Sequence, residues 1–587
     1  MSEGVRPRSA LVIGSDTRAF LGVVRSLGRK GVAVDVVPFD FSSVALASRY
    51  IRSVHRLPLV QLDPEAWVQA VLELCAELRP DFVVPCDDRS IIPLHEFRQR
   101  VAQLPLGMPG EPAFSAFFDK AATRALAASC GVPVAQGRVL VPGDTAENLI
   151  AEFGLPLFIK PRNSYLLRAL ESRRGVSACR RREELVAALA SIADPGEYLV
   201  EAALPGVGVG VSVLAHHGVV SQAFQHRRVR EPVGGGGSSY RKSEAVSPDL
   251  EAMTVAMCKA SQLEGVAMFE YRVDDASGKK ALLEVNARFW GSLPLAMAAG
   301  VDFPYLWFSQ ALGEPPAPRA DYRVPWYARN LLADLYATAG HIEARRSEGI
   351  GFVAGESLRW AGSLGRLLIG IESLDTLTRD DPRPGLREFG AIRHKLVERF
   401  VRQLPWTASQ RARQLRNRIA QAWRDAQQAN RPVQIVIACY GNICRSPFAA
   451  AELQRQLGAD PSQAEINGAA LAYRPSRASP ALAISAAARL GVDLSAHRSR
   501  YASDEMLEQA DLVVVFDGSN LELLATRGVV LKLPPIRLAE LLPEAGLSLD
   551  INDPIDGNAD VFDRCYRRIS RAVGEFKRVS VEAVAPP

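Results

Sequence analysis

The sequence has only eight cysteines in 587 residues, and they are scattered without the regular spacing of a disulfide framework. We therefore expect most of them to be reduced thiols, and buried ones to behave as small hydrophobic residues. Only Cys439 and Cys444 form a suggestive pair. This usage argues against a small secreted domain held together by disulfides.

Long apolar runs and a strong net charge are also lacking. No segment approaches 18 uninterrupted apolar residues, which predicts no transmembrane helix and no stable membrane insertion. The N-terminus passes directly into a strand-like run without the features of a signal peptide, so we expect a cytoplasmic protein. The 70 basic and 65 acidic residues leave a net charge of only +5, which predicts no nucleic-acid partner.

The chain is too long for one hydrophobic core, so several domains are expected. Strands at 10–13, 32–37 and 82–86 alternate with helical segments, which favours a parallel sheet. The turn at 14–18 could hold a phosphate, but its single glycine favours a structural turn. From 118 to 313, shorter strands and hairpins predict an α+β domain.

A proline-containing stretch at 313–326 ends that pattern, and helical segments follow. The Arg-rich helix expected at 407–430 has an apolar stripe, which favours a packing or linker role over a membrane-surface role. Alternation of strands and helices resumes at Val433, with strands expected at 434–438, 512–516 and 529–533. The predicted fold is a multidomain α/β protein with domains at 1–110 (α/β), 111–320 (α+β), 321–430 (helical extension and linker) and 431–582 (α/β with a parallel sheet).

The segment from Cys439 to Pro447, CYGNICRSP, joins a buried strand to a helix. Loop amides and a helix N-terminus converge there, and such a concavity binds a phosphate dianion. The helix dipole and a guanidinium favour the thiolate of Cys439, which makes it a nucleophile, and Arg445 can grip two phosphoryl oxygens. Ser446 can donate to the thiolate. The predicted phosphate-binding loop comprises Tyr440, Gly441, Asn442, Ile443 and Cys444, in which Gly441 and Asn442 suit left-handed backbone angles.

A leaving oxygen needs a proton, and Asp553, followed by Pro554, is the best candidate for a general acid. An Asp-Pro pair by itself is more often only a turn.

These residues resemble the low-molecular-weight protein tyrosine phosphatase family over about 433–578, including GVDLSAHRSR at 491–500 and ADLVVVFD at 510–517. The resemblance implies that Cys439 is the nucleophile, Arg445 the transition-state clamp, Ser446 the thiolate partner and Asp553 the acid. Cys444 would trap oxidised Cys439 as a disulfide, or be a small buried residue. A structural role is favoured for His497 over orientation of the phosphate loop.

Two features of this resemblance concern the substrate, a phosphotyrosine protein or a small phosphomonoester. Ile443 stands where relatives specific for phosphoarginine have threonine, which favours phosphotyrosine. Ile555 and Asp556 replace the aromatic residues that often flank a phenyl ring, which leaves aryl recognition open.

The segment 266–288 reads as a hairpin. If it is symmetric about Ser277, Glu270 lies opposite Glu284, and Glu284, Asn286 and Arg288 share one face. Opposed carboxylates repel unless a cation lies between them, and these oxygen ligands suit Mg²⁺. An exposed acidic face is the second interpretation.

Two lysines upstream, Lys120 and Lys160, are candidate phosphate ligands. With the hairpin they resemble the ATP-grasp superfamily over about 110–313, through DKAATRALAASCGVPV, PLFIKP, YLVEAALPG and LLEVNARFWGS. Residues 1–110 resemble the α/β domain that precedes an ATP-grasp domain.

The resemblance implies that Lys120 and Lys160 contact the phosphates of ATP and that Glu201 meets the adenine amino group. It further implies a Mg²⁺ site at Glu270, Glu284 and Asn286, with Arg288 steadying the transferred phosphoryl group. Such enzymes activate a carboxylate as an acyl phosphate, which an amine attacks. The loop at 230–243 is either a closing lid or a plain flexible loop.

The sequence therefore predicts a bifunctional enzyme that uses ATP and Mg²⁺, acts on small-molecule carboxylate and amine substrates, and carries a phosphatase. The alternative is a signalling phosphatase whose ATP-grasp part only binds nucleotide or senses it.

Overall fold

The computed structural model describes residues 8–14, 18–170, 173–231, 237–401, 405–458, 463–473, 476–542 and 549–584. The chain forms two compact units, one of 1–39 with 43–389 and one of 40–42 with 390–587. Positions 15–17 of the first turn and 232–236 of the loop at 230–243 lie outside the described residues. None of the described helices is both long and apolar enough to span a membrane.

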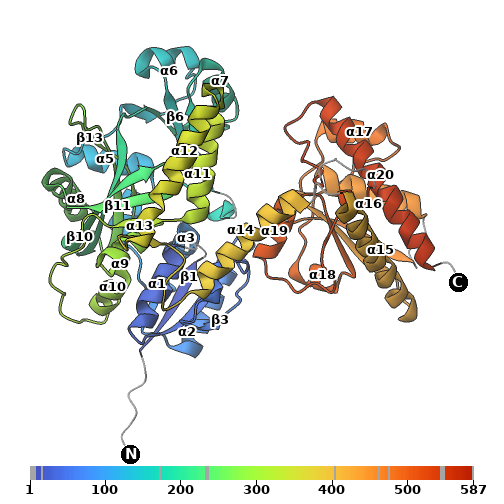
Figure 1. The fold of residues 1–587 in the computed structure, drawn as a ribbon, viewed down its shortest axis with the longest axis horizontal. Helices are drawn as coiled ribbons and strands as arrows, with labels where there is room; N and C mark the ends of the chain where they lie inside the picture. Colours follow the sequence, from blue (N-terminus) through green and yellow to red (C-terminus); the bar gives the residue numbers. More distant parts are fainter. Residues whose placement is uncertain are drawn as a thin grey trace, which may run out of the picture. The chain divides into compact units, whose positions relative to one another are not determined.

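The first unit opens with a parallel sheet in the order β3-β2-β1-β4, as its buried apolar strands predict (Figure 1). Strands β1 and β4 are buried along their whole length, which explains why they are almost entirely apolar, whereas the edge strand β3 contains the more exposed Arg52 and Ser53. The elements are β1 (Ser9–Gly14), α1 (Ala19–Arg29), β2 (Ala33–Pro38), β3 (Ile51–Val54), α2 (Pro64–Leu78), β4 (Phe82–Pro85) and α3 (Asp88–Glu96).

A small antiparallel sheet in the order β5-β8-β6-β7 follows, with α6 and α7 beside it (Figure 1). Buried apolar residues of both helices and of the strands form one core cluster. The elements here are α4 (Glu111–Phe117), α5 (Lys120–Ser129), β5 (Gly137–Val139), α6 (Ala146–Phe153), β6 (Leu157–Pro161), β7 (Ser177–Cys179), α7 (Arg182–Ala190) and β8 (Tyr198–Ala202).

The large sheet has seven strands in the order β13-β12-β9-β10-β11-β14-β15, and all neighbours are antiparallel except β14 and β15. These short strands and hairpins confirm the expected α+β character. The elements are β9 (Val207–His216), β10 (Val219–Arg230), β11 (Tyr240–Glu244), α8 (Pro248–Ala260), β12 (Gly265–Val273), β13 (Lys280–Asn286), α9 (Leu293–Ala299) and α10 (Phe303–Ala311).

The hairpin of β12 and β13 pairs Glu270 with Glu284 and Met268 with Asn286, which is the register expected from the sequence. A bulge after Glu270 shifts the pairs nearer the turn by one residue, so Tyr271 faces Leu282 and the hairpin is not symmetric throughout. Beyond the bulge, Glu284 and Asn286 are partly exposed and alternate with the buried Val285.

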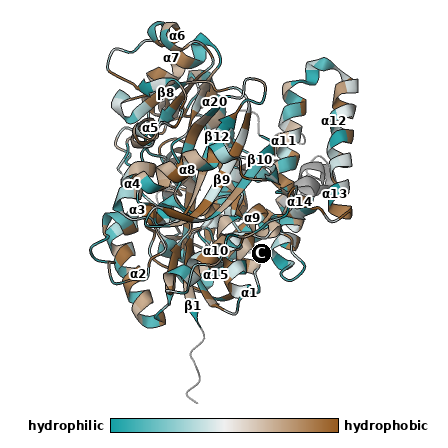
Figure 2. Ribbon diagram, turned by 90° about the vertical axis from the view of Figure 1, so that its left-hand side faces the viewer, coloured by the Kyte–Doolittle hydropathy of each residue, from teal (hydrophilic) through white to brown (hydrophobic). Residues whose placement is uncertain are grey.

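The stretch 321–430 is mostly helical, as expected, but it also supplies strands β14 and β15, so the large sheet continues past residue 320. Helices α11 and α12 run side by side as a hairpin (Figure 2). The domain boundaries given above stay predictions. The elements are β14 (Tyr327–Arg329), α11 (Leu331–Ala344), α12 (Ile350–Ser363), α13 (Gly365–Leu368), β15 (Glu372–Leu374), α14 (Arg383–Val401) and α15 (Pro405–Gln428).

The second unit contains a parallel sheet in the order β17-β16-β18-β19. Leu415, Ile419 and Trp423 of α15 are buried in its core, which confirms the expected packing stripe. The strand expected at 529–533 is wrong: Val530 is 81% exposed, and the last strand instead follows the two prolines at 534 and 535. The elements are β16 (Val433–Cys439), α16 (Arg445–Leu457), β17 (Ala464–Ala470), α17 (Ala481–Ala488), α18 (Asp504–Gln509), β18 (Leu512–Val515), α19 (Gly518–Thr526), β19 (Ile536–Arg537) and α20 (Ala559–Val584).

Candidate functional sites

The loop between β16 and α16 gathers hydrogen-bond donors around one sulfur atom. Cys439 ends the central strand and is 2% exposed, and its Sγ lies 3.1 Å from Ser446 Oγ. The backbone N–H of Asn442 donates to the same sulfur at 3.3 Å. Ser446 Oγ also accepts a hydrogen bond from Asn442 Nδ2 at 2.8 Å. The sulfur therefore has partners that stabilise a thiolate.

Asn442 holds the shape of this loop. Its φ of +49° is left-handed, as expected, whereas Gly441 is not left-handed, so that part of the prediction is wrong. The side-chain oxygen of Asn442 accepts from the Arg500 backbone N–H at 3.0 Å. His497 Nε2 lies 2.8 Å from the Asn442 carbonyl oxygen, so His497 contacts the phosphate loop directly.

Arg445 is 1% exposed and lies between two carboxylates. Its Nη2 donates to Asp553 Oδ2 at 2.6 Å, and its Nη1 donates both to Asp517 and, at 2.8 Å, to the Ile551 carbonyl oxygen. The candidate acid and the candidate clamp therefore meet in one site. Burial opposes the ionisation of Asp517, but hydrogen bonds from Ser519 and Arg445 outweigh it and lower the pKa of Asp517.

Sequence reasoning did not identify Asp517 as a site residue. A signal was available, because Asp517 follows β18, and the carboxyl ends of neighbouring parallel strands meet at the same edge of a sheet.

We expect Asp517→Asn to lower kcat/KM for aryl phosphates about tenfold, because Arg445 loses one of its two carboxylate partners. Asparagine keeps the helix cap that Asp517 forms with Asn520 N–H, which limits the effect on folding. Steady-state kinetics and inhibition by inorganic phosphate would measure the change. Asp493→Asn, in an exposed loop, is the control, and equal activity of the two variants would contradict the assigned contact.

Cys439 and Cys444, the two cysteines of the phosphate loop, are both free thiols in this structure. Cys444 is 2% exposed, and burial raises the pKa of its thiol, so Cys444 stays protonated near neutral pH. Ile443 is also buried, whereas Tyr440 and Ile555 are each 40% exposed. The trapping role of Cys444 stays a prediction.

In the first unit, the seven side chains expected to form the ATP site line one cleft of about 730 Å³. They come from the start of α5, from the small sheet, from the β12–β13 hairpin and from the second residue after that hairpin. These residues are Lys120, Lys160, Glu201, Glu270, Glu284, Asn286 and Arg288.

The two opposed carboxylates of the cleft differ in their tendency to ionise. Burial raises the pKa of Glu270, and the charge of Glu284 adds to this effect. Burial also opposes the ionisation of Glu284, but Lys120 and Lys160 outweigh it and lower its pKa. Arg228 of β10 forms an ion pair with Glu270. The cleft thus holds one carboxylate whose ionised form is favoured by two lysines beside a second whose charge is offset by Arg228.

Other cleft residues are held by partners that the sequence did not predict. Glu201 lies between Lys160 Nζ at 2.5 Å and Arg124 Nη1 at 2.8 Å. Arg288 Nε donates to Asp88 Oδ1 at 2.9 Å. Arg124 follows Lys120 by one helical turn, which was a usable signal, whereas Asp88 is distant in sequence.

The donor set of the cleft fits Mg²⁺. Glu270, Glu284 and Asn286 offer two carboxylates and an amide oxygen, which are the hard ligands that Mg²⁺ prefers. Asn286 Nδ2 lies 3.5 Å from Glu284 Oε1, so the three side chains are neighbours on the hairpin.

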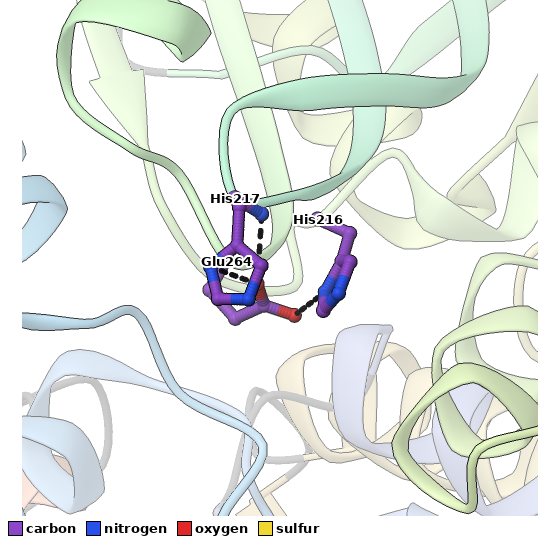
Figure 3. A group of neighbouring side chains, drawn as sticks. All are labelled: His216, His217 and Glu264. Carbon is purple, nitrogen blue, oxygen red and sulfur yellow. Dashed lines mark hydrogen bonds and ion pairs between the residues drawn. The ribbon is translucent and has the colours of Figure 1, made fainter.

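Among the described residues, His216, His217 and Glu264 also combine metal-ligand types (Figure 3). Glu264 Oε1 lies 3.0 Å from His216 Nδ1, and Oε2 accepts the His217 backbone N–H at 3.0 Å. Both histidine side chains are more than half exposed. Glu264 thus stabilises the turn between β9 and β10 through these two hydrogen bonds, and this structural role explains why the three residues lie together.

Comparison with known proteins finds a family match within each unit. Residues 434–584 match the family model "Low molecular weight phosphotyrosine protein phosphatase", and residues 194–330 match "ATP-grasp in the biosynthetic pathway with Ter operon". The chain is 31% identical over 139 residues to the probable low molecular weight protein-tyrosine-phosphatase EpsP of Ralstonia nicotianae, covering 24% of this chain and 90% of that protein.

Two further relatives support the assignment. The low molecular weight protein-tyrosine-phosphatase Etp of Escherichia coli is 31% identical over 149 residues, covering 25% of this chain and 94% of that protein. The D-alanine–D-alanine ligase of Acidiphilium cryptum is 27% identical over 219 residues, covering 35% of this chain and 69% of that protein. The chain therefore belongs, through its C-terminal part, to the low-molecular-weight phosphotyrosine phosphatase family, and it carries an ATP-grasp domain ahead of that part.

Proposed function

We propose that this protein is a bifunctional enzyme, in which an ATP- and Mg²⁺-dependent carboxylate ligase is joined to a cysteine-dependent phosphatase for phosphotyrosine or related phosphomonoesters. The observation that carries the phosphatase is the convergence of Cys439, Ser446, Arg445 and Asp553 in one site. The gathering of all seven expected side chains in one cleft supports the ligase.

In the phosphatase, Cys439 Sγ attacks phosphorus while the ester bond to the leaving oxygen breaks. Asp553 gives its proton to that oxygen, so the alcohol or phenol departs neutral. Arg445 binds the phosphoryl oxygens. These oxygens compete with Asp553 for Arg445 Nη2, which donates to Asp553 in this structure. Asp553 then takes a proton from the water that attacks phosphorus, and Cys439 departs as a thiolate stabilised by Ser446 and the Asn442 N–H.

Two partly exposed residues close in sequence to Cys439 and Asp553 support an aryl substrate. Tyr440 and Ile555 each leave 40% of their surface exposed, and apolar surface of this kind can pack against a phenyl ring. Ile555 thus offers apolar contact where the usual aromatic residue is absent.

We expect Asp553→Asn to lower kcat/KM for phenyl phosphate by about 10²–10³, because a positioned general acid contributes that much. The loss with 4-nitrophenyl phosphate should be smaller, since its leaving group is stable without a proton. Steady-state kinetics on both substrates would test this. Equal losses would remove Asp553 from the role of acid.

In the ligase, Lys120 and Lys160 bind ATP phosphates, and Arg288 steadies the phosphoryl group as it moves to the substrate carboxylate. Glu270, Glu284 and Asn286 would hold Mg²⁺, which supplies neutralisation of phosphate charge when bound. Asp88 fixes the Arg288 guanidinium, and Arg228 lies beside the two carboxylates. Phosphoryl transfer leaves ADP, and an amine then attacks the acyl carbon, so that the amide bond forms as inorganic phosphate leaves.

The ligase is tested by incubating the full-length protein with ATP, Mg²⁺ and pooled carboxylates and amines, and measuring release of ADP. We expect release that depends on one pool of each class. Binding of ATP without ADP release from any pool would instead favour a phosphatase with a nucleotide-binding or sensory module.

A further inference from the structure

The C-terminal helix α20 presents two neighbouring stripes to the phosphatase site. Its buried apolar residues recur every three or four positions, which packs one face of the helix into the core of the second unit. Two residues of this face, Tyr566 and Cys565, each have a polar neighbour along the helix: Ser570 lies four residues after Tyr566, and Arg568 lies three residues after Cys565. Each pair therefore points to one side of the helix.

The first stripe fixes the end of the phosphate loop. Tyr566 is fully buried, and its hydroxyl donates to the Cys444 carbonyl oxygen at 2.9 Å. Its ring stacks on Phe448 of α16 with centroids 4.1 Å apart and planes 1° from parallel. Ser570 Oγ donates to Glu452 Oε1 of α16 at 2.7 Å. Because Cys444 directly precedes Arg445, these contacts hold the backbone from which the clamp projects.

The second stripe holds the segment that carries the acid. Arg568 Nη1 donates to the Asp550 carbonyl oxygen at 2.9 Å, and Cys565 Sγ lies 3.8 Å from the Asn552 carbonyl oxygen. Ile551 lies between Asp550 and Asn552 in the sequence, and its carbonyl oxygen accepts a hydrogen bond from Arg445. Asp553 follows directly. Three consecutive carbonyl groups ahead of the acid are thus tied to α20 or to the clamp.

We propose that α20 sets the position of the acid relative to the phosphate loop, with Tyr566 as the positioning residue for the loop and Arg568 as the positioning residue for Asp553. The inference rests on the proposed phosphatase activity. Proton transfer requires heavy atoms within about 2.6–3.2 Å, so a small displacement of either segment removes the acid from reach. One rigid helix in contact with both segments fixes their separation.

The two roles predict different kinetic signatures, because only the acid is sensitive to the leaving group. Arg568→Met removes the donor to Asp550 while keeping an unbranched side chain. We expect kcat/KM for phenyl phosphate to fall about tenfold or more, and that for 4-nitrophenyl phosphate by less than about threefold. Retained turnover of the second substrate shows that the variant is folded. Arg567→Met, at the exposed neighbouring position on α20, is the matched control and should match wild type on both substrates.

Tyr566→Phe removes one hydroxyl group and keeps the ring stack on Phe448. We expect kcat/KM to fall about fivefold to tenfold for both substrates alike, because one neutral hydrogen bond to the Cys444 carbonyl is lost and Arg445 is held less firmly. The inhibition constant for inorganic phosphate should rise by a similar factor.

Arg568→Lys, which restores a cationic donor, should return the ratio of kcat/KM for the two substrates toward that of wild type.

Equal losses on both substrates in Arg568→Met, with no recovery in Arg568→Lys, would overturn the role of Arg568. Tyr566→Phe with unchanged kinetics and phosphate inhibition would overturn the role of Tyr566. These outcomes differ from a failure of the proposed function, in which wild-type protein would hydrolyse neither substrate.

Discussion

Cys439→Ser is expected to lower the hydrolysis of aryl phosphates by about four orders of magnitude or more, the scale of loss when a covalent nucleophile is removed. The partners that the structure gives the sulfur, Ser446 Oγ and the Asn442 N–H, stabilise an anion, which serine does not form near neutral pH, and neither of them is a base that would activate a hydroxyl. Initial rates with 4-nitrophenyl phosphate, with phosphate or vanadate binding measured alongside, would test this. Binding of the oxyanion should survive, because the loop amides and Arg445 are unchanged.

Cys130→Ser is a suitable control, since Cys130 is a free thiol of the first unit, whereas the phosphate loop belongs to the second. Its phosphatase activity should equal that of wild type. Substantial activity in Cys439→Ser would refute the assigned nucleophile and, with it, the mechanism through a covalent cysteinyl-phosphate intermediate.

The second large effect is expected for Glu284→Gln, which should lower ATP-dependent release of ADP at least a hundredfold, on the order of losses at metal-holding side chains. Glutamine has the same shape but removes the carboxylate that Lys120 and Lys160 keep ionised. The remaining Glu270 is already paired with Arg228, so one charged ligand cannot take over from the other. A titration with Mg²⁺ at saturating ATP would measure the change.

Asp275→Asn is the matched control, because Asp275 lies in the turn of the same hairpin, with its side chain 70% exposed and outside the cleft. Equal ADP release in the two variants, at low and at saturating Mg²⁺, would contradict the metal role of Glu284.

Measuring ADP release and phosphatase activity in both Cys439→Ser and Glu284→Gln also tests whether the two sites are coupled. Independent sites predict that Cys439→Ser leaves ADP release unchanged and that Glu284→Gln leaves phosphatase activity unchanged.

Much of both candidate sites could be predicted because the signals are local in sequence. The loop from Cys439 to Ser446 is eight residues long, so its strand, turn and helix start bring the sulfur and the hydroxyl close together. In the β12–β13 hairpin, the turn pairs Val273 with Lys280 and Tyr271 with Leu282, and a bulge after Glu270 then brings Glu270 opposite Glu284. The bulge after Glu270 was not predictable, because the extra residue is accommodated by packing in the sheet.

Two other predictions failed because they depended on neighbours that are distant in the sequence. The mostly apolar run at 529–533 was expected to form a strand, but Val530 is 81% exposed. Left-handed geometry fell on Asn442 alone, since hydrogen bonds from Arg500 and to Ser446 fix that residue. Local composition did not reveal which strands and loops would lie next to these positions.

The sequence by itself determined the chemical groups of each site and their local geometry: a thiol, a hydroxyl and a guanidinium on one short loop, and two carboxylates on one hairpin. Only the tertiary structure decided what holds them, namely Asp517 and Tyr566 around Arg445 and its loop, and Asp88 beside Arg288. The physical reason is chain separation. A turn fixes neighbours within a few residues, whereas these partners are brought together across 72 to 200 residues by strand order and helix packing.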